Sequence, residues 1–171
     1  KFSNIDDLKP TRFGTLTFFY ARGVYEIDYD GNVVWVKENK PVSKDDMMET
    51  YHHEFTRLNS GHYMVAGNEP VTVALNADTA DLKGLSIPML RVINKKAHRK
   101  LNLGTIIEFD KKGNEVWVWK ASEHLIDDTA FLHRIPRDPN EINPHMNSFY
   151  FDEKNKFIYV SFKNPHYIVK I

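Results

Sequence analysis

Short runs of alternating apolar and polar residues, each ending in a turn signal, recur along this sequence. Residues 23–38 (GVYEIDYDGNVVWVKE) contain two such runs around Asp30-Gly31-Asn32, and residues 104–120 (GTIIEFDKKGNEVWVWK) contain two more around Lys112-Gly113-Asn114. Extended runs that flank a pair such as Asp-Gly are typical of a β-hairpin. The pattern therefore predicts a β-hairpin in each of these two stretches.

The two predicted hairpins align with each other at one constant offset. The aligned pairs are Glu26 with Glu108, Asp28 with Asp110, Gly31 with Gly113, Asn32 with Asn114, and Trp35 with Trp117. A register shared by five residues of different chemistry indicates an internal repeat. We expect the two tryptophans to occupy equivalent places in the core between sheets.

A second kind of hairpin, which begins with histidine, follows each of the first kind. Residues 52–67 turn at Asn59-Ser60-Gly61, and residues 145–162 turn at Lys154-Asn155-Lys156. Residues 166–171 are interpreted as one further strand. The stretches 69–103 and 122–144 break the pattern, and we expect them to be irregular apart from an extra strand at Val71–Leu75.

Repetition of four antiparallel strands around an axis is the architecture of a β-propeller. The predicted fold class is all-β, with four-stranded antiparallel blades of which this chain covers about two. Residues 1–171 would form part of a single propeller domain, in which 23–67 hold the end of one blade and the start of the next, and 104–171 hold a blade end and the following blade. A closed propeller needs about four blades or more, so we expect a segment of a larger propeller. A small β-sandwich is the alternative.

The overall composition excludes several other kinds of protein. The 23 basic and 23 acidic residues give a formal net charge of +0, which disfavours binding to nucleic acid or to an anionic membrane surface. Without cysteine there is no disulfide or thiolate nucleophile. No run approaches the ~18 apolar residues of a membrane span. No signal peptide is visible, although the sequence begins at Lys1 rather than methionine.

Histidines at the start of the inner strands are the candidate site residues. In a propeller, the strands that line the channel present their first residues at one mouth, so His52 or His53 and His145 would meet there. Asn147 lies two positions after His145, on the same side of a regular strand, and Lys163 ends the next strand. Imidazole, amide and ammonium donors suit the oxyanion of a sulfate or phosphate ester.

A neutral imidazole can also act as a general base or a nucleophile. A metal site formed by His52, His53, His62 and Glu54 is the less favoured interpretation, because adjacent histidines of a regular strand point to opposite faces. No metal is therefore expected. The remaining histidines have no partner pattern and are interpreted as structural; they are His62, His98, His124, His133 and His166.

Four segments in order resemble the bacterial arylsulfate sulfotransferases. They are GVYEIDYDGNVVW, HHEFTRLNSGHYMV, GTIIEFDKKGNEVWVW and HMNSFYFDEKNKFIYVSFKNPHYIVKI. The resemblance implies a six-bladed propeller that is periplasmic or exported. It also implies a reaction without a cofactor, in which a histidine takes the sulfo group from an aryl sulfate and passes it to a phenol. The implied partners are these two small molecules, with no nucleic acid and no membrane span, and a homodimer is left open.

Carried over residue by residue, the resemblance makes His53 and His145 catalytic, and His52, Asn147 and Lys163 substrate-binding. Lys163 stands where the family has arginine, so the planar fork that grips a sulfuryl group would be lost. The family's covalent histidine lies on a later blade, and no residue of this chain corresponds to it. We therefore expect this segment alone to be inactive. The alternatives are a non-catalytic propeller module for binding or scaffolding, and an aromatic surface that binds polysaccharide or peptide.

Overall fold

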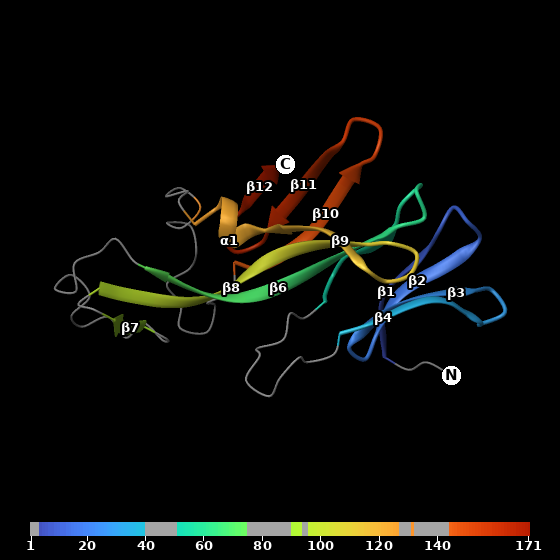
Figure 1. Cartoon of the computed structure of the whole chain (residues 1–171), viewed down its shortest axis with the longest axis horizontal. Helices are drawn as coiled ribbons and strands as arrows, with labels where there is room; N and C mark the ends of the chain where they lie inside the picture. Colours follow the sequence, from blue (N-terminus) through green and yellow to red (C-terminus); the bar gives the residue numbers. More distant parts are fainter. Residues whose placement is uncertain (1–3, 40–50, 75–89, 94–95, 127–130, 132–143) are drawn as a thin grey trace.

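The computed structural model describes residues 4–39, 51–74, 90–93, 96–126, 131 and 144–171, and these form three antiparallel β-sheets (Figure 1). The first sheet has the order β1-β2-β3-β4, formed by Ile5–Pro10, Thr15–Tyr20, Gly23–Asp28 and Val33–Glu38. The third has the order β10-β11-β12, formed by Met146–Asp152, Phe157–Phe162 and Tyr167–Lys170. The all-β, propeller-type fold class is confirmed.

The second sheet joins the two hairpins that flank the stretch 69–103. Its strands are β5 (Phe55–Arg57), β6 (Tyr63–Ala74), β8 (Lys96–Phe109) and β9 (Glu115–Lys120), in the order β5-β6-β8-β9. A short strand, β7 (Leu90–Ile93), pairs with the start of β8, and the helix α1 (Ala121–His124) follows β9. Apart from β7, this is the four-stranded antiparallel arrangement expected of a blade.

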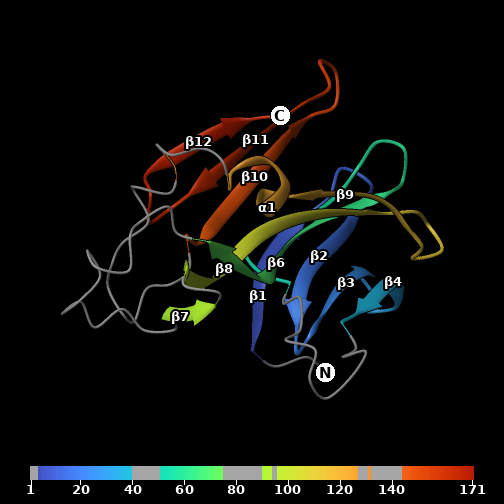
Figure 2. The ribbon, with the colours of Figure 1, turned by 60° about the vertical axis from the view of Figure 1, so that its left-hand side comes forward.

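Two parts of the fold differ from the sequence-based expectation. The first sheet begins with β1 and β2, which pair ahead of the predicted 23–38 hairpin. The extra strand expected at Val71–Leu75 is the continuation of β6, which pairs with β8 as far as Ala74 opposite His98. Residues 69–74 of β6 and 98–103 of β8 therefore form a regular paired extension that projects beyond the rest of the sheet (Figures 1 and 2). Residue 75 itself lies outside the described residues.

An aspartate at the start of the turn organises one hairpin in each sheet. Asp28 Oδ1 accepts hydrogen bonds from the backbone of Asp30 and Asn32, and its Oδ2 accepts one from Asn32 Nδ2 at 2.9 Å. Asp110 and Asp152 make the same kind of contacts with Asn114 and Asn155. In all three, the hydrogen bond from the asparagine side chain holds the pKa of the carboxyl below its ordinary value. The repeat of Asp and Asn in the sequence reflects this turn.

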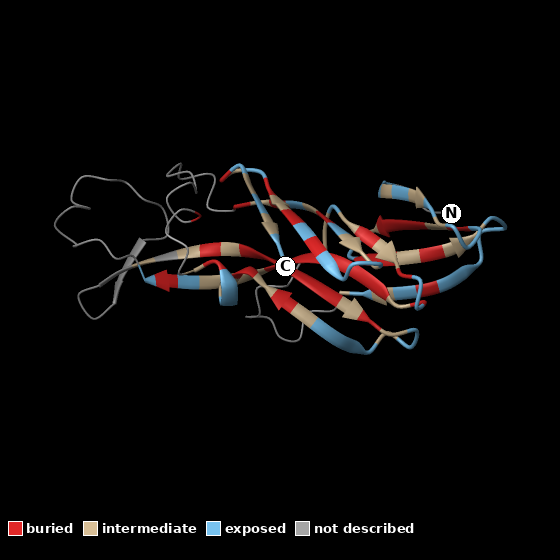
Figure 3. Cartoon of the chain, turned by 90° about the horizontal axis from the view of Figure 1, so that it is seen from above, coloured by how far each residue is buried: buried red, intermediate tan, exposed pale blue. Residues whose placement is uncertain are grey.

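Aromatic side chains fill the interface between the first two sheets. Trp35 is buried and stacks on Tyr63 with ring centroids 3.9 Å apart. Phe55 lies 5.9 Å from the same tryptophan, and Phe19 and Phe109 complete the cluster. Because side chains alternate along a strand, each sheet can pack on a neighbour with both faces. Figure 3 shows the resulting buried bands along the strands.

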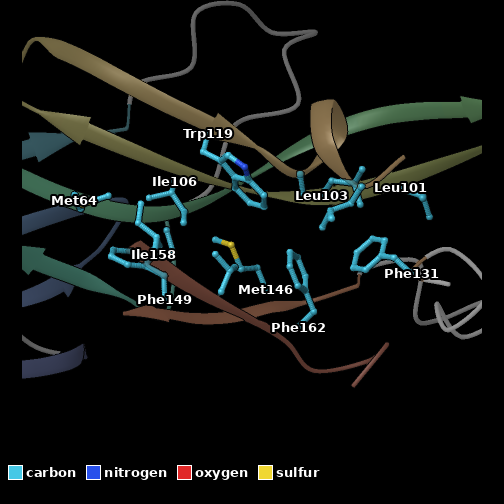
Figure 4. Close-up of a cluster of buried hydrophobic side chains, with 14 of the residues drawn as sticks. Met64, Leu101, Leu103, Ile106, Trp119, Phe131, Met146, Phe149, Ile158 and Phe162 are labelled. Carbon is cyan, nitrogen blue, oxygen red and sulfur yellow. The ribbon is translucent and has the colours of Figure 1, made fainter. Parts of the chain in front are cut away.

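The second and third sheets pack through a separate core (Figure 4). Met64, Ile106 and Trp119 of the second sheet meet Phe149 and Ile158 of the third. Trp119 therefore occupies the core place that the alignment assigned to Trp117, and that assignment was wrong. Trp117 lies two residues nearer the hairpin turn, outside this cluster, and is 37% exposed.

A glycine fixes the approach of the third sheet to the second. The backbone of Gly104 in β8 lies so close to Met146 that a Cβ at this position would be 2.7 Å from the Met146 Cβ. Met146 is fully buried and begins β10. The residue before it, His145, is consequently held against the second sheet, where the first candidate histidines are.

Candidate functional site

The backbone turns sharply at both candidate catalytic histidines. His53 (φ 61°) precedes β5 and His145 (φ 56°) precedes β10, and both have the left-handed conformation that non-glycine residues seldom adopt. Backbone hydrogen bonds hold these segments, from His52 N to Ala66 O and from Lys163 N to His145 O, each at 2.9 Å. Unusual φ at such positions is a common feature of functional sites.

The two histidines come from different sheets and meet at their Nε2 atoms, 3.0 Å apart. Their ring centroids are 4.8 Å apart. A hydrogen bond between two imidazole nitrogens requires one to donate and the other to accept, so at least one ring is neutral at its Nε2. The structure therefore brings His53 and His145 together, as the propeller interpretation expected of the pair.

His52 is the third member of the histidine cluster, which we define as His52, His53 and His145. Its ring centroid is 4.9 Å from that of His53 and 6.5 Å from that of His145. The expectation that His52 and His53 point to opposite faces was wrong, because the positive φ at His53 breaks strand alternation. His53 is exposed, whereas the His52 ring nitrogens are buried, and neither makes a well-formed hydrogen bond with any residue that the structure describes.

Burial lowers the pKa of His52 to about 4. Positive charge on His53 and His145 lowers it further, while the Asn68 side chain and the Gly67 backbone oppose the change. The hydrogen bonding of Asn68 is incomplete, since its Oδ1 also lacks a partner among the residues that the structure places. His52 is thus a neutral imidazole at neutral pH, beside two rings that share a proton.

The neutral state of His52 predicts a specific loss of stability in acid. The unfolded chain has a histidine pKa near 6.5, above the folded value of about 4, so it binds more protons between these pH values. The free energy of unfolding should be highest above pH ~6.5 and fall by about 3 kcal/mol as the pH drops through 4. In the His52→Gln variant, this contribution is absent. The free energy of unfolding, measured with urea, should therefore fall by about 3 kcal/mol less between pH 7 and pH 4 than in the unmodified chain. The exposed His166→Gln variant is the control, and an unchanged slope in His52→Gln would contradict the assignment.

Asn147 follows His145 by two residues and Lys163 bonds to it through the backbone, but among the described residues neither side chain makes a hydrogen bond or an ion pair with the histidine cluster. A β-bulge between Met146 and Ser148 shifts the register at Asn147, so the argument that it shares a side with His145 does not hold. Asn147 is exposed, and within the described residues its side chain makes no hydrogen bond. Lys163 is exposed as well, and only its backbone bonds to His145. Their substrate-binding roles stay predictions.

The residues of the alternative metal site do not come together, because His62 and Glu54 each pair with a different residue. His62 Nδ1 lies 2.7 Å from Glu108 Oε1, and Glu54 bonds to Lys9. Among the residues that the structure describes, no three histidine, aspartate or glutamate side chains are grouped so that they could hold a metal ion. His124 stacks on Trp119, and His133 lies outside the described residues.

Acidic residues of the first sheet approach the histidine cluster, and the sequence analysis did not find them. Asp7 Oδ2 accepts hydrogen bonds from Lys9 Nζ (2.8 Å) and from the backbone of Phe55 (3.3 Å), two residues after His53. Asp7 also has a positive φ of 54°, in a bulge of β1. The consecutive aspartates at positions 6 and 7 were the available signal, but it required recognising residues 5–20 as two strands.

The chain has three stacked antiparallel sheets, and histidines precede the first strand of the second sheet (β5) and of the third sheet (β10). These features define a chain of the β-propeller class. Residues 89–171 match the family described as "Arylsulfotransferase (ASST)", which confirms the family resemblance over just under half of the chain. The matched part contains His145, Asn147 and Lys163 but not His52 or His53. No curated protein matches the chain.

One similar solved structure is the crystal structure of a protein of unknown function from Bacteroides caccae. It is 13% identical, with a TM-score of 0.45, and the match covers 98% of this chain and 45% of that chain. This chain therefore spans less than half the length of that protein. In the described part of the chain, no helix is long and apolar enough to cross a membrane.

Proposed function

We propose that the chain is part of an arylsulfotransferase-like enzyme, which transfers a sulfo group from an aryl sulfate to a phenolic acceptor through a histidine intermediate. The nucleophile would lie outside residues 1–171. In this proposal the enzyme is periplasmic or exported and uses no cofactor. The observation that carries the proposal is the bond between His53 and His145, which two separate sheets bring to one place.

The histidine cluster suits the charge changes of sulfo transfer. When the nucleophile's nitrogen bonds to sulfur, the S–O bond to the donor breaks and a phenolate oxygen leaves with the electron pair. A protonated imidazole of the His53–His145 pair donates a proton or a hydrogen bond to that oxygen. In the second half, the acceptor hydroxyl gives its proton to the neutral imidazole while its oxygen bonds to sulfur and the S–N bond breaks.

Lys163 and Asn147 would contact the sulfuryl oxygens in this proposal. Both side chains are exposed and therefore accessible to a ligand. An ammonium group supplies a point charge rather than the two parallel hydrogen bonds of a guanidinium, so we expect weaker orientation of the sulfo group than arginine would give.

Binding of an aryl sulfate to this chain tests the proposal without requiring turnover. Titration with phenyl sulfate should shift the imidazole NMR signals of His53 and His145 and leave that of His98 unchanged, because His98 pairs with Ala74 at the far end of the β6–β8 extension. Phenol at the same concentrations is the uncharged control. In a longer chain that adds the later blades, p-nitrophenyl sulfate and phenol should release p-nitrophenol. If phenyl sulfate caused no NMR shift at His53 and His145 and the longer chain released no p-nitrophenol, the proposal would be refuted.

A non-catalytic propeller that binds an oxyanion is the second candidate. The lysine at position 163 favours it, because the family's arginine is absent there. This candidate predicts the phenyl sulfate shifts at His53 and His145 but no nitrophenol release from the longer chain. The two candidates are therefore separated by turnover, not by binding.

A further inference from the structure

A groove on the first sheet leads away from the histidine cluster. A pocket of about 560 Å³ is lined by His52, His53 and Tyr51 on one side and by Asp6, Asp7 and Arg22 on the other. An adjoining hollow of about 390 Å³ is lined by Asn4, Asp6, Phe19, Tyr20 and Ala21. The two hollows share Asp6, Phe19 and Ala21, so together they form one groove with the histidines at one end.

The charges of the groove are arranged along its length. Asp7 is engaged by Lys9 and by the Phe55 backbone. The carboxylate of Asp6 is exposed and makes no hydrogen bond or ion pair with any described residue. Arg22 lines only the histidine end, whereas Asp6 lines both hollows. The histidine end of the groove thus has the cationic group of Arg22, and the carboxylate of Asp6, unpaired among the described residues, lines both ends.

Aromatic residues supply the walls between these charges. Phe19 is nearly buried and lines both hollows, Tyr51 lines the histidine end and Tyr20 lines the far end. Aromatic walls favour a flat ring, whose faces and edges they contact. A ligand that complements the histidines, the aromatic walls and the carboxylate of this groove has a hydroxyl beside His53, a ring beside Phe19, and a positive charge at Asp6.

We propose that this groove is the acceptor subsite and that Asp6 makes it selective for phenolic amines. The proposal rests on the proposed function, because it needs the sulfo group at the histidines. The acceptor oxygen bonds to sulfur as the S–N bond to the sulfo-carrying histidine breaks, and the hydroxyl proton passes to the imidazole of His53. The ammonium group takes no part in bond making and is held by the carboxylate of Asp6.

Equilibrium binding of two acceptors of the same shape tests the selectivity. Tyramine carries an ammonium group and 4-ethylphenol does not, and their binding can be followed by NMR titration of the 171-residue chain. At low salt, tyramine should bind about three- to fivefold more tightly, as expected for one exposed charge pair. The difference should disappear in Asp6→Asn and at high ionic strength.

The control is Asp30→Asn, which removes the same charge from an exposed turn outside the groove and should keep the preference for tyramine. Equal affinity for the two phenols in the unmodified chain, or a preference that survives in Asp6→Asn, would overturn the inference. Failure of the proposed function looks different: phenyl sulfate would then leave the signals of His53 and His145 unchanged, whatever tyramine does.

Discussion

Replacing His145 with asparagine is expected to slow aryl sulfate transfer by about 10²- to 10⁴-fold, the range in which a positioned acid–base group contributes. The variant is to be made in the longer chain that carries the later blades. It removes the ring that shares a proton with His53 at 3.0 Å. Asparagine tolerates a positive φ better than alanine does, so the backbone at φ 56° should be retained. The rate is measured as nitrophenol release from p-nitrophenyl sulfate in the presence of phenol.

The chain contains a matched control for this substitution. His166 is also a histidine with positive φ (49°), and it lies exposed in the turn between β11 and β12. His166→Asn makes the same chemical change in the same backbone conformation. The His166 ring is not part of the histidine cluster, although its backbone bonds to Lys163, so this variant should leave the rate unchanged. Equal rates for the two variants would remove His145 from the catalytic machinery.

Replacing Glu26 with alanine is expected to lower the free energy of unfolding by about 3–5 kcal/mol, as happens when one partner of a buried ion pair is removed. Glu26 is fully buried between the first two sheets. Its Oε1 accepts hydrogen bonds from Arg57 Nη1 (2.6 Å) and from Thr15, and its Oε2 accepts one from Tyr63 Oη (2.6 Å). Burial and the Glu26 carboxylate together raise the pKa of Tyr63. Urea unfolding measures the change.

The internal repeat supplies the control for Glu26. Glu108 is its equivalent in the second sheet, but its side chain is 23% exposed and pairs with His62. Glu108→Ala should lower stability by less than about 1 kcal/mol, as for other solvent-accessible pairs. The double variant Glu26→Met/Arg57→Met should recover much of the loss, since it removes the isolated charge. A loss for Glu26→Ala no larger than that for Glu108→Ala would refute the buried-pair argument.

The turns and the histidine pair show how far the sequence determines this structure. Short-range chemistry fixed the hairpins, because Asp28 and Asn32 make the turn contacts themselves. The meeting of His52 or His53 with His145 was expected from the repeat together with propeller geometry. The first two strands were missed because their turn, residues 11–14, lacks the Gly-Asn pair that marks the two predicted hairpins.

Where prediction failed, side-chain direction was inferred from strand alternation across an irregular backbone. The positive φ at His53 brings the His52 and His53 rings together, and the bulge at Asn147 breaks the alternation from which its direction was inferred. The prediction that Trp117 lies in the core failed for another reason. Its position in the repeat was right, but how far the third sheet covers the second is a tertiary property that no local pattern contains.

The left-handed backbone at His53 and His145 has a consequence for how such a chain can change over time. The kinks are set by neighbouring strands, and asparagine or glycine adopts the same conformation with little strain. A single replacement at either position would therefore abolish the proposed acid–base role while the sheets assembled as before. Descendants that keep the architecture as inert structural parts are one mutational step away, and the reverse step is equally short.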